Sequence, residues 1–130
     1  MSHLPELVTL LNVLLLFATA LAVGYGRHRY QIRAPAVSGH PQFERAYRVQ
    51  MNTLENTVVF LPALWLAALH GFALWAGIAG LVWLVGRTWY MVAYLRRPAS
   101  RGPAYLLATS AWFVVVGMAG WGVAKAMLAG

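Results

Sequence analysis

Four long apolar stretches, separated by short polar segments, account for almost the whole chain. They cover approximately residues 4–25, 43–69, 72–97 and 104–128. Each is close to the ~20 residues that a helix needs to cross the hydrocarbon layer of a bilayer. The second stretch opens with polar turns, so we expect its helix to project from the bilayer before it enters. The pattern predicts an all-α integral membrane protein, a single domain of residues 1–130 folded as an up-and-down bundle of four helices.

Composition supports a membrane protein and leaves little room for anything else. Of the 130 residues, 61% are hydrophobic and 10% are charged, whereas soluble domains are about 45–50% apolar and about 25% charged. The first stretch resembles a signal peptide, but residues 1–6 contain no Lys or Arg, so we expect it to be retained. Because the chain contains no cysteine, any thiol that reacts here must come with a ligand.

The net charge of +7 is concentrated in and beside two links between the apolar stretches. In a soluble protein such charge would suggest a nucleic-acid partner, but here anionic lipid headgroups explain much of it, and we expect no nucleic acid. The positive-inside rule predicts that loops 26–42 and 96–103 are cytoplasmic. Both termini and the short His70–Gly71 turn are then expected on the opposite side.

Two of the predicted helices carry polar stripes. The spacing puts each of two sets on one helical face: Arg45, Arg48, Asn52, Glu55 and Asn56 in the second helix, and Arg87, Tyr90, Tyr94 and Arg97 in the third. An ionisable group in hydrocarbon costs ~2.5–3.5 kcal/mol or more unless it finds a partner. Glu55 and Arg87 are the deepest charges, so we expect a structural ion pair between them. Whether that pair only holds the helices together stays open.

The remaining polar groups exceed what the protein itself can neutralise, because the chain has only three acidic residues. A surplus of arginines, amides and tyrosine hydroxyls lies near the predicted cytoplasmic boundary. Arginine suits carboxylates, and amides suit peptide groups. The surplus therefore predicts a site for a small, anionic, cytosolic ligand, with an apolar co-substrate arriving from the lipid.

The second-helix pattern Glu44-Arg45-x-x-Arg48-x-x-x-Asn52-x-x-Glu55 resembles the signature of the membrane-associated proteins in eicosanoid and glutathione metabolism, the MAPEG family. The resemblance runs from about residue 27 to 105. It implies a homotrimer with glutathione as substrate, bound between neighbouring subunits on the cytoplasmic side. The implied activity is that of a glutathione transferase or peroxidase acting in detoxification on lipophilic electrophiles or lipid hydroperoxides.

The resemblance also implies roles for individual residues. The implied glutathione contacts are Arg27 in the first helix, Arg48, Gln50, Asn52 and Glu55 in the second, and Tyr90 and Tyr94 in the third. Arg101 matches the catalytic arginine that stabilises the glutathione thiolate, and Arg87 matches an arginine of the leukotriene-type members. Asn56 and His28 depart from those members, which have tyrosine and arginine there, so a leukotriene substrate is not implied.

Three other functions were weighed. The family also contains a non-catalytic member that presents lipid to a partner enzyme, so a ligand-binding scaffold is the alternative to an enzyme. A small multidrug exporter would need a carboxylate in the first helix, and none lies between Leu7 and Tyr30. The four histidines lack the spacing of metal ligands, so we expect no metal site.

Overall fold

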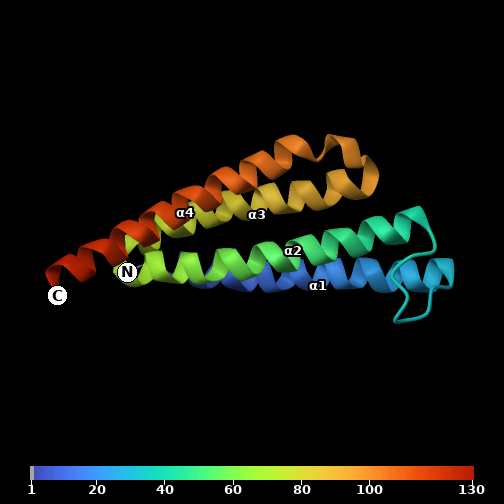
Figure 1. The fold of residues 1–130 in the computed structure, drawn as a ribbon, viewed down its shortest axis with the longest axis horizontal. Helices are drawn as coiled ribbons and strands as arrows, with labels where there is room; N and C mark the ends of the chain where they lie inside the picture. The colour runs from blue at the N-terminus through green and yellow to red at the C-terminus, as the bar shows by residue number, and fades with distance from the viewer. Residues whose placement is uncertain (1) are drawn as a thin grey trace.

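The protein, seen here as a computed structural model that describes residues 2–130, consists of helices arranged in two pairs (Figure 1). The α-helices are α1 (Leu4–Tyr30), α2 (Pro41–Ala67), α3 (Ala73–Arg96) and α4 (Gly102–Ala129). In Figure 1, α2 runs back along α1 and α4 runs back along α3. The two pairs lie close together near the chain termini and spread apart towards the other end, which we call the loop end. It carries the 31–40 segment and the 3₁₀ turn Pro98–Ser100.

No loop separates α2 from α3. They are joined by a π-helical turn, Ala68–Phe72, in which His70 and Gly71 leave helical geometry. Gly71 has a φ of 92°, a conformation that glycine adopts without the steric cost of a side chain. When α2, the π-helical turn and α3 are counted as one segment, the chain has three apolar helical segments long enough to cross a membrane. They are Leu4–Tyr30, Pro41–Arg96 and Gly102–Ala129. The all-helical prediction is confirmed, and the middle segment folds back on itself at the predicted turn.

The middle of the bundle is closely packed. Phe60 of α2 and Trp83 of α3 are buried and stack with their ring centroids 3.9 Å apart. Small residues let the helices approach, as is common between membrane helices. A Cβ added at Gly86 of α3 would lie 2.8 Å from the backbone nitrogen of Ala108 in α4. The α3–α4 contact therefore depends on the absence of a side chain at residue 86.

Polar groups bind across helices both inside the bundle and at its surface. The Asn12 amide of α1 donates to the Thr57 hydroxyl of α2 at 3.3 Å. Pro62 has no N–H to offer the carbonyl one turn earlier in α2. Next to that carbonyl, the Val59 oxygen accepts a hydrogen bond from the Trp112 indole of α4 at 2.8 Å. These bonds satisfy polar groups that lipid could not, and they fix α2 against its neighbours.

We expect Gly86→Ala to lower the free energy of unfolding by about 1–3 kcal/mol, because the added methyl group overpacks the α3–α4 contact. The measurement is unfolding by sodium dodecyl sulfate titration in mixed micelles. Gly120→Ala in α4 is the matched control, since a Cβ there meets nothing within 4 Å. Equal stability of the two variants would contradict the close approach of α3 and α4.

Candidate functional site

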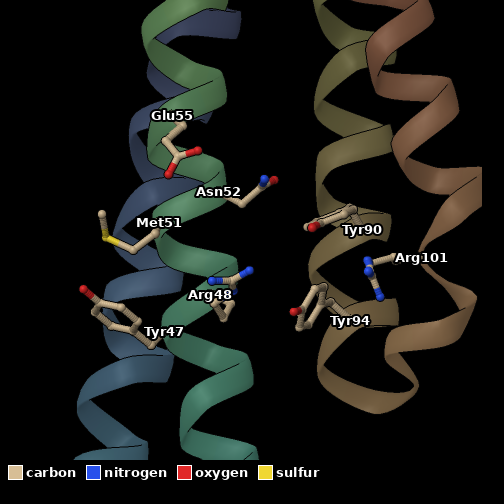
Figure 2. Close-up of a pocket in the computed structure, with 8 residues that line it drawn as sticks. All are labelled: Tyr47, Arg48, Met51, Asn52, Glu55, Tyr90, Tyr94 and Arg101. Atoms are coloured by element: carbon tan, nitrogen blue, oxygen red, sulfur yellow. The ribbon is translucent and has the colours of Figure 1, made fainter. Parts of the chain in front are cut away.

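A cavity of about 470 Å³ opens between α2 and α3 on the side of the loop end, where the helix pairs diverge. Its walls are Tyr47, Arg48, Met51, Asn52 and Glu55 of α2, Tyr90 and Tyr94 of α3, and Arg101 at the start of α4. Figure 2 shows Arg48 and Asn52 pointing across towards the two tyrosines of α3, while Tyr47, Met51 and Glu55 lie along the adjacent face of α2. Three helices thus contribute to one polar site within an apolar bundle.

Six of the predicted site residues line this cavity: Arg48, Asn52, Glu55, Tyr90, Tyr94 and Arg101. Helical periodicity explains the grouping, because residues separated by three, four or seven positions share a face. Gln50 does not line the cavity because it lies on another side of α2. Arg27 of α1 lies away from it too, where its Nη1 donates to the Ala36 carbonyl at 2.7 Å. Within one chain, the site is therefore smaller than the predicted set.

Tyr47 and Met51 line the cavity although neither was predicted from the sequence. Tyr47, Met51 and Glu55 follow one another at intervals of four residues, so helical spacing predicts that all three lie on one face of α2. Neither Tyr47 nor Met51 is charged, however, so in the sequence the two do not stand out from residues that pack against other helices or lie at the membrane interface. Their presence gives the cavity an apolar margin beside its charged groups.

The predicted ion pair between Glu55 and Arg87 is wrong. Among residues 2–130, the only pair of oppositely ionisable side chains within 4.0 Å is His3 and Glu6. Arg87 is 1% exposed, and its Nη2 donates to Asn52 Oδ1 at 2.9 Å and to Thr53 Oγ1 at 3.0 Å. The physical reason is rotation about the α2 axis: the face that meets Arg87 carries an amide and a hydroxyl, while Glu55 lines the open cavity.

Arg101 is held at the edge of the cavity by two contacts. Its Nη1 donates to the Pro98 carbonyl at 2.6 Å, and its guanidinium carbon lies 5.0 Å from the centre of the Tyr94 ring. A cation over an aromatic face is attracted by the electrons of the ring. The 3₁₀ turn after α3 thus provides the acceptor that orients the guanidinium, and the rest of that exposed group can bind a ligand.

The charges of the cavity favour an anion that can also donate hydrogen bonds. The walls carry two guanidinium groups, those of Arg48 and Arg101, and one carboxylate, that of Glu55. A second cavity, of about 550 Å³, shares Tyr47, Arg48 and Tyr94 with the first and reaches Pro98 at the loop end. A ligand could therefore enter from water at that end. Among residues 2–130, no group of His, Asp or Glu side chains could hold a metal ion.

Comparison with known proteins finds one family model and several relatives that match most of this chain. The sequence model of the MAPEG family matches residues 6–121. An uncharacterized protein of Synechocystis sp. is 40% identical over 87% of this chain and 83% of its own length. Leukotriene C4 synthase of Bos taurus is 38% identical over 83% of this chain and 73% of its own. Microsomal glutathione S-transferase 2 of Homo sapiens is 32% identical over 84% and 74%, respectively.

The free energy of unfolding should distinguish the observed partners of Arg87 from the ion pair expected from the sequence. We expect Glu55→Gln to change it by less than about 0.5 kcal/mol, as for a surface substitution. A buried ion pair that lost one partner would cost about 3–5 kcal/mol. The nearly isosteric Thr53→Val should cost about 1–3 kcal/mol, because it removes a hydrogen-bond acceptor from a buried cation. Unfolding in mixed micelles measures both, and a large loss in Glu55→Gln would restore the ion pair.

Proposed function

This chain belongs to the MAPEG family, and we propose that it is an integral membrane enzyme that activates the thiol of glutathione. The activated thiol attacks lipophilic electrophiles or lipid hydroperoxides dissolved in the bilayer. The observation that supports this most directly is the cavity itself, which brings six of the family-matched residues together on three helices. Relatives named leukotriene C4 synthase and microsomal glutathione S-transferase 2 support the choice of glutathione.

The chemistry of the walls suits this tripeptide. Glutathione has two carboxylates, one amino group, two peptide groups and a thiol. Arg48 can pair with a carboxylate and Glu55 with the amino group, while Asn52 and the hydroxyls of Tyr90 and Tyr94 can bind polar groups between them. A volume of about 470 Å³ lies within the ~300–1,000 Å³ that is typical of small-molecule pockets.

Arg101 is the proposed catalytic residue. A free thiol has a pKa of about 8.5, so only a few per cent of it is ionised at neutral pH. Lowering that pKa by ~2 units requires ~2.7 kcal/mol of preferential stabilisation of the thiolate, which a guanidinium can provide once a bound ligand has excluded water from it. Arg101 is oriented for this by Pro98 and Tyr94.

Two reactions follow from one thiolate. In conjugation, the sulfur forms a bond to an electrophilic carbon and a leaving group departs with its electron pair. In peroxide reduction, the sulfur attacks one peroxide oxygen, the O–O bond breaks, and the departing alkoxide takes a proton from water. The sulfenic acid of glutathione that results is reduced by a second glutathione, which yields the disulfide and water.

We further propose how the protein sits in the membrane. As one domain of residues 1–130 it makes four crossings, with loops 26–42 and 96–103 in the cytoplasm and both termini opposite. Three copies associate, and Arg27 and Gln50 complete the cavity of a neighbouring chain. The support for this is that both residues lie outside the cavity of their own chain.

A non-catalytic lipid-binding scaffold is the second candidate. The observation that favours it is an apolar groove of about 700 Å³ between α1 and α3, lined by residues that include Leu11, Leu14 and Leu81. Such a groove suits an acyl chain whether or not chemistry takes place. A conjugation assay with a generic electrophile in detergent separates the two functions, because only the enzyme consumes glutathione.

Calorimetric titration of the purified protein with glutathione tests binding. We expect saturable binding by the wild type and about 10–100-fold weaker binding by Arg48→Ala, since a hydrogen bond to a charged group contributes about 1.5–3 kcal/mol. Arg33→Ala is the control, because this arginine lies in the exposed 31–40 segment outside the cavity. An equal loss in both variants would indicate a non-specific effect of charge, and no binding by the wild type would refute the proposed function.

Arg101→Ala tests catalysis separately. We expect it to bind glutathione within a few-fold of the wild type, yet to return the pKa of the bound thiol to about 8.5, the value of a free thiol. Ultraviolet absorbance of the thiolate, followed against pH, measures this pKa. If the pKa is the same in the variant and the wild type, Arg101 has no part in activating the thiol.

A further inference from the structure

Arg87 is the most deeply buried charge of the bundle. It is 1% exposed, and its Nε and Nη1 have no hydrogen-bond partner. Its guanidinium carbon lies 4.4 Å from the centre of the Tyr90 ring. A buried cation is costly, and apolar side chains usually hold helices together at least as well. Arg87 does not itself line the cavity. A role in the site must therefore act through a residue that does.

Asn52 is that residue, because it contacts both Arg87 and the cavity. Its Oδ1 accepts from Arg87 Nη2 at 2.9 Å and from Asn56 Nδ2 at 3.3 Å. Asn56 is itself held, since its Nδ2 donates to the main-chain oxygen of Asn52 at 2.8 Å. Both neighbours approach Asn52 with donors, and a guanidinium has no acceptor to offer.

The orientation of the Asn52 amide is therefore determined. A half-turn of the amide would put its NH₂ group against the guanidinium of Arg87, donor against donor. With Oδ1 facing Arg87, Nδ2 is left on the side of the cavity, and it donates to no other residue among 2–130. Figure 2 shows the tip of Asn52 extending into the space between α2 and α3.

We infer that Arg87 is a positioning residue that locks the Asn52 amide with its N–H groups towards the cavity, so that the ligand must present an acceptor there, either a carboxylate or a peptide carbonyl. The inference rests on the proposed function, since glutathione supplies both kinds of acceptor. It specifies which hydrogen-bonding groups the cavity offers. Like Arg48 and Arg101, Asn52 only donates hydrogen bonds to a ligand, and Glu55 is the one charged acceptor in the wall.

Asn52→Asp tests this inference most directly. The carboxylate keeps an acceptor for Arg87 and the shape of the side chain, but replaces the donor that faces the cavity. We expect the variant to fold and to bind glutathione at least about 100-fold more weakly than the wild type, because it loses a donor and gains a negative charge. If Asn52→Asp binds glutathione as the wild type does, the inference is wrong.

A double-mutant cycle tests whether Arg87 acts through Asn52. We expect Asn52→Ala and Arg87→Gln each to weaken glutathione binding by about 10-fold, and the double variant to be within about 3-fold of Arg87→Gln alone. Independent effects would multiply, and that result would overturn the inference. Arg96→Gln is the matched control: it is the same change on the same helix, at an exposed position outside the cavity, and binding should stay at the wild-type level.

A measurement on the ligand-free wild type separates this inference from the proposed function. The chain has three asparagines, Asn12, Asn52 and Asn56, so selective ¹⁵N labelling gives three side-chain NH₂ signals. We expect the Asn52 signal to exchange with water and the buried Asn12 signal to be protected. Protection of Asn52 would overturn the inference even if glutathione binds. Exchange at Asn52 in a protein that does not bind glutathione would refute only the proposed function.

Discussion

The site depends on how one buried cation is accommodated without a carboxylate. Arg87 lies between α2 and α3, and the amide oxygen of Asn52 and the hydroxyl of Thr53 are its hydrogen-bond acceptors. Neutral acceptors stabilise a cation less than a carboxylate does. Because Arg87 does not bind it, the carboxylate of Glu55 remains on the cavity wall. Had Glu55 paired with Arg87, the cavity would have lost its single charged acceptor.

The packing of the bundle explains why a polar cavity can exist beside so much apolar surface. About two to three helical turns from the π-helical turn, α2 and α3 are held together by the stacked rings of Phe60 and Trp83. About one turn further along α3, Gly86 brings α4 close and Arg87 contacts α2. Towards the loop end the two helix pairs diverge (Figure 1), and most of the side chains that line the cavity there are polar. The change from apolar to polar contacts therefore coincides with the place where the cavity begins.

Much of the fold and of the cavity could be predicted from the sequence, because these features depend on helical periodicity and on composition. The four apolar stretches predicted the helical class, and the two polar stripes contained five residues of the cavity. The sixth predicted residue that lines it, Arg101, was assigned by resemblance. What failed depends on how one helix is rotated against another. Periodicity shows that Glu55 and Asn52 share a face, but not which of them meets Arg87. Thr53 gave no signal, because a threonine in an apolar helix is unremarkable in sequence. Resemblance assigned Arg27 and Gln50 to glutathione. Because neither lines the cavity of its own chain, their proposed role requires an assembly.

The unpaired state of Glu55 also bears on the form of the ligand. Arg48 and Arg101 in the wall and Arg87 behind it carry three positive charges, against one negative charge on Glu55. This leaves a surplus of two. At neutral pH glutathione carries one net negative charge as a thiol and two as a thiolate, so the thiolate is the form that balances the site. In a medium of low dielectric constant an unbalanced charge is costly. In the proposed mechanism, Arg101 stabilises the thiolate at the sulfur, and Arg87 favours the same ionisation of the thiol from a distance.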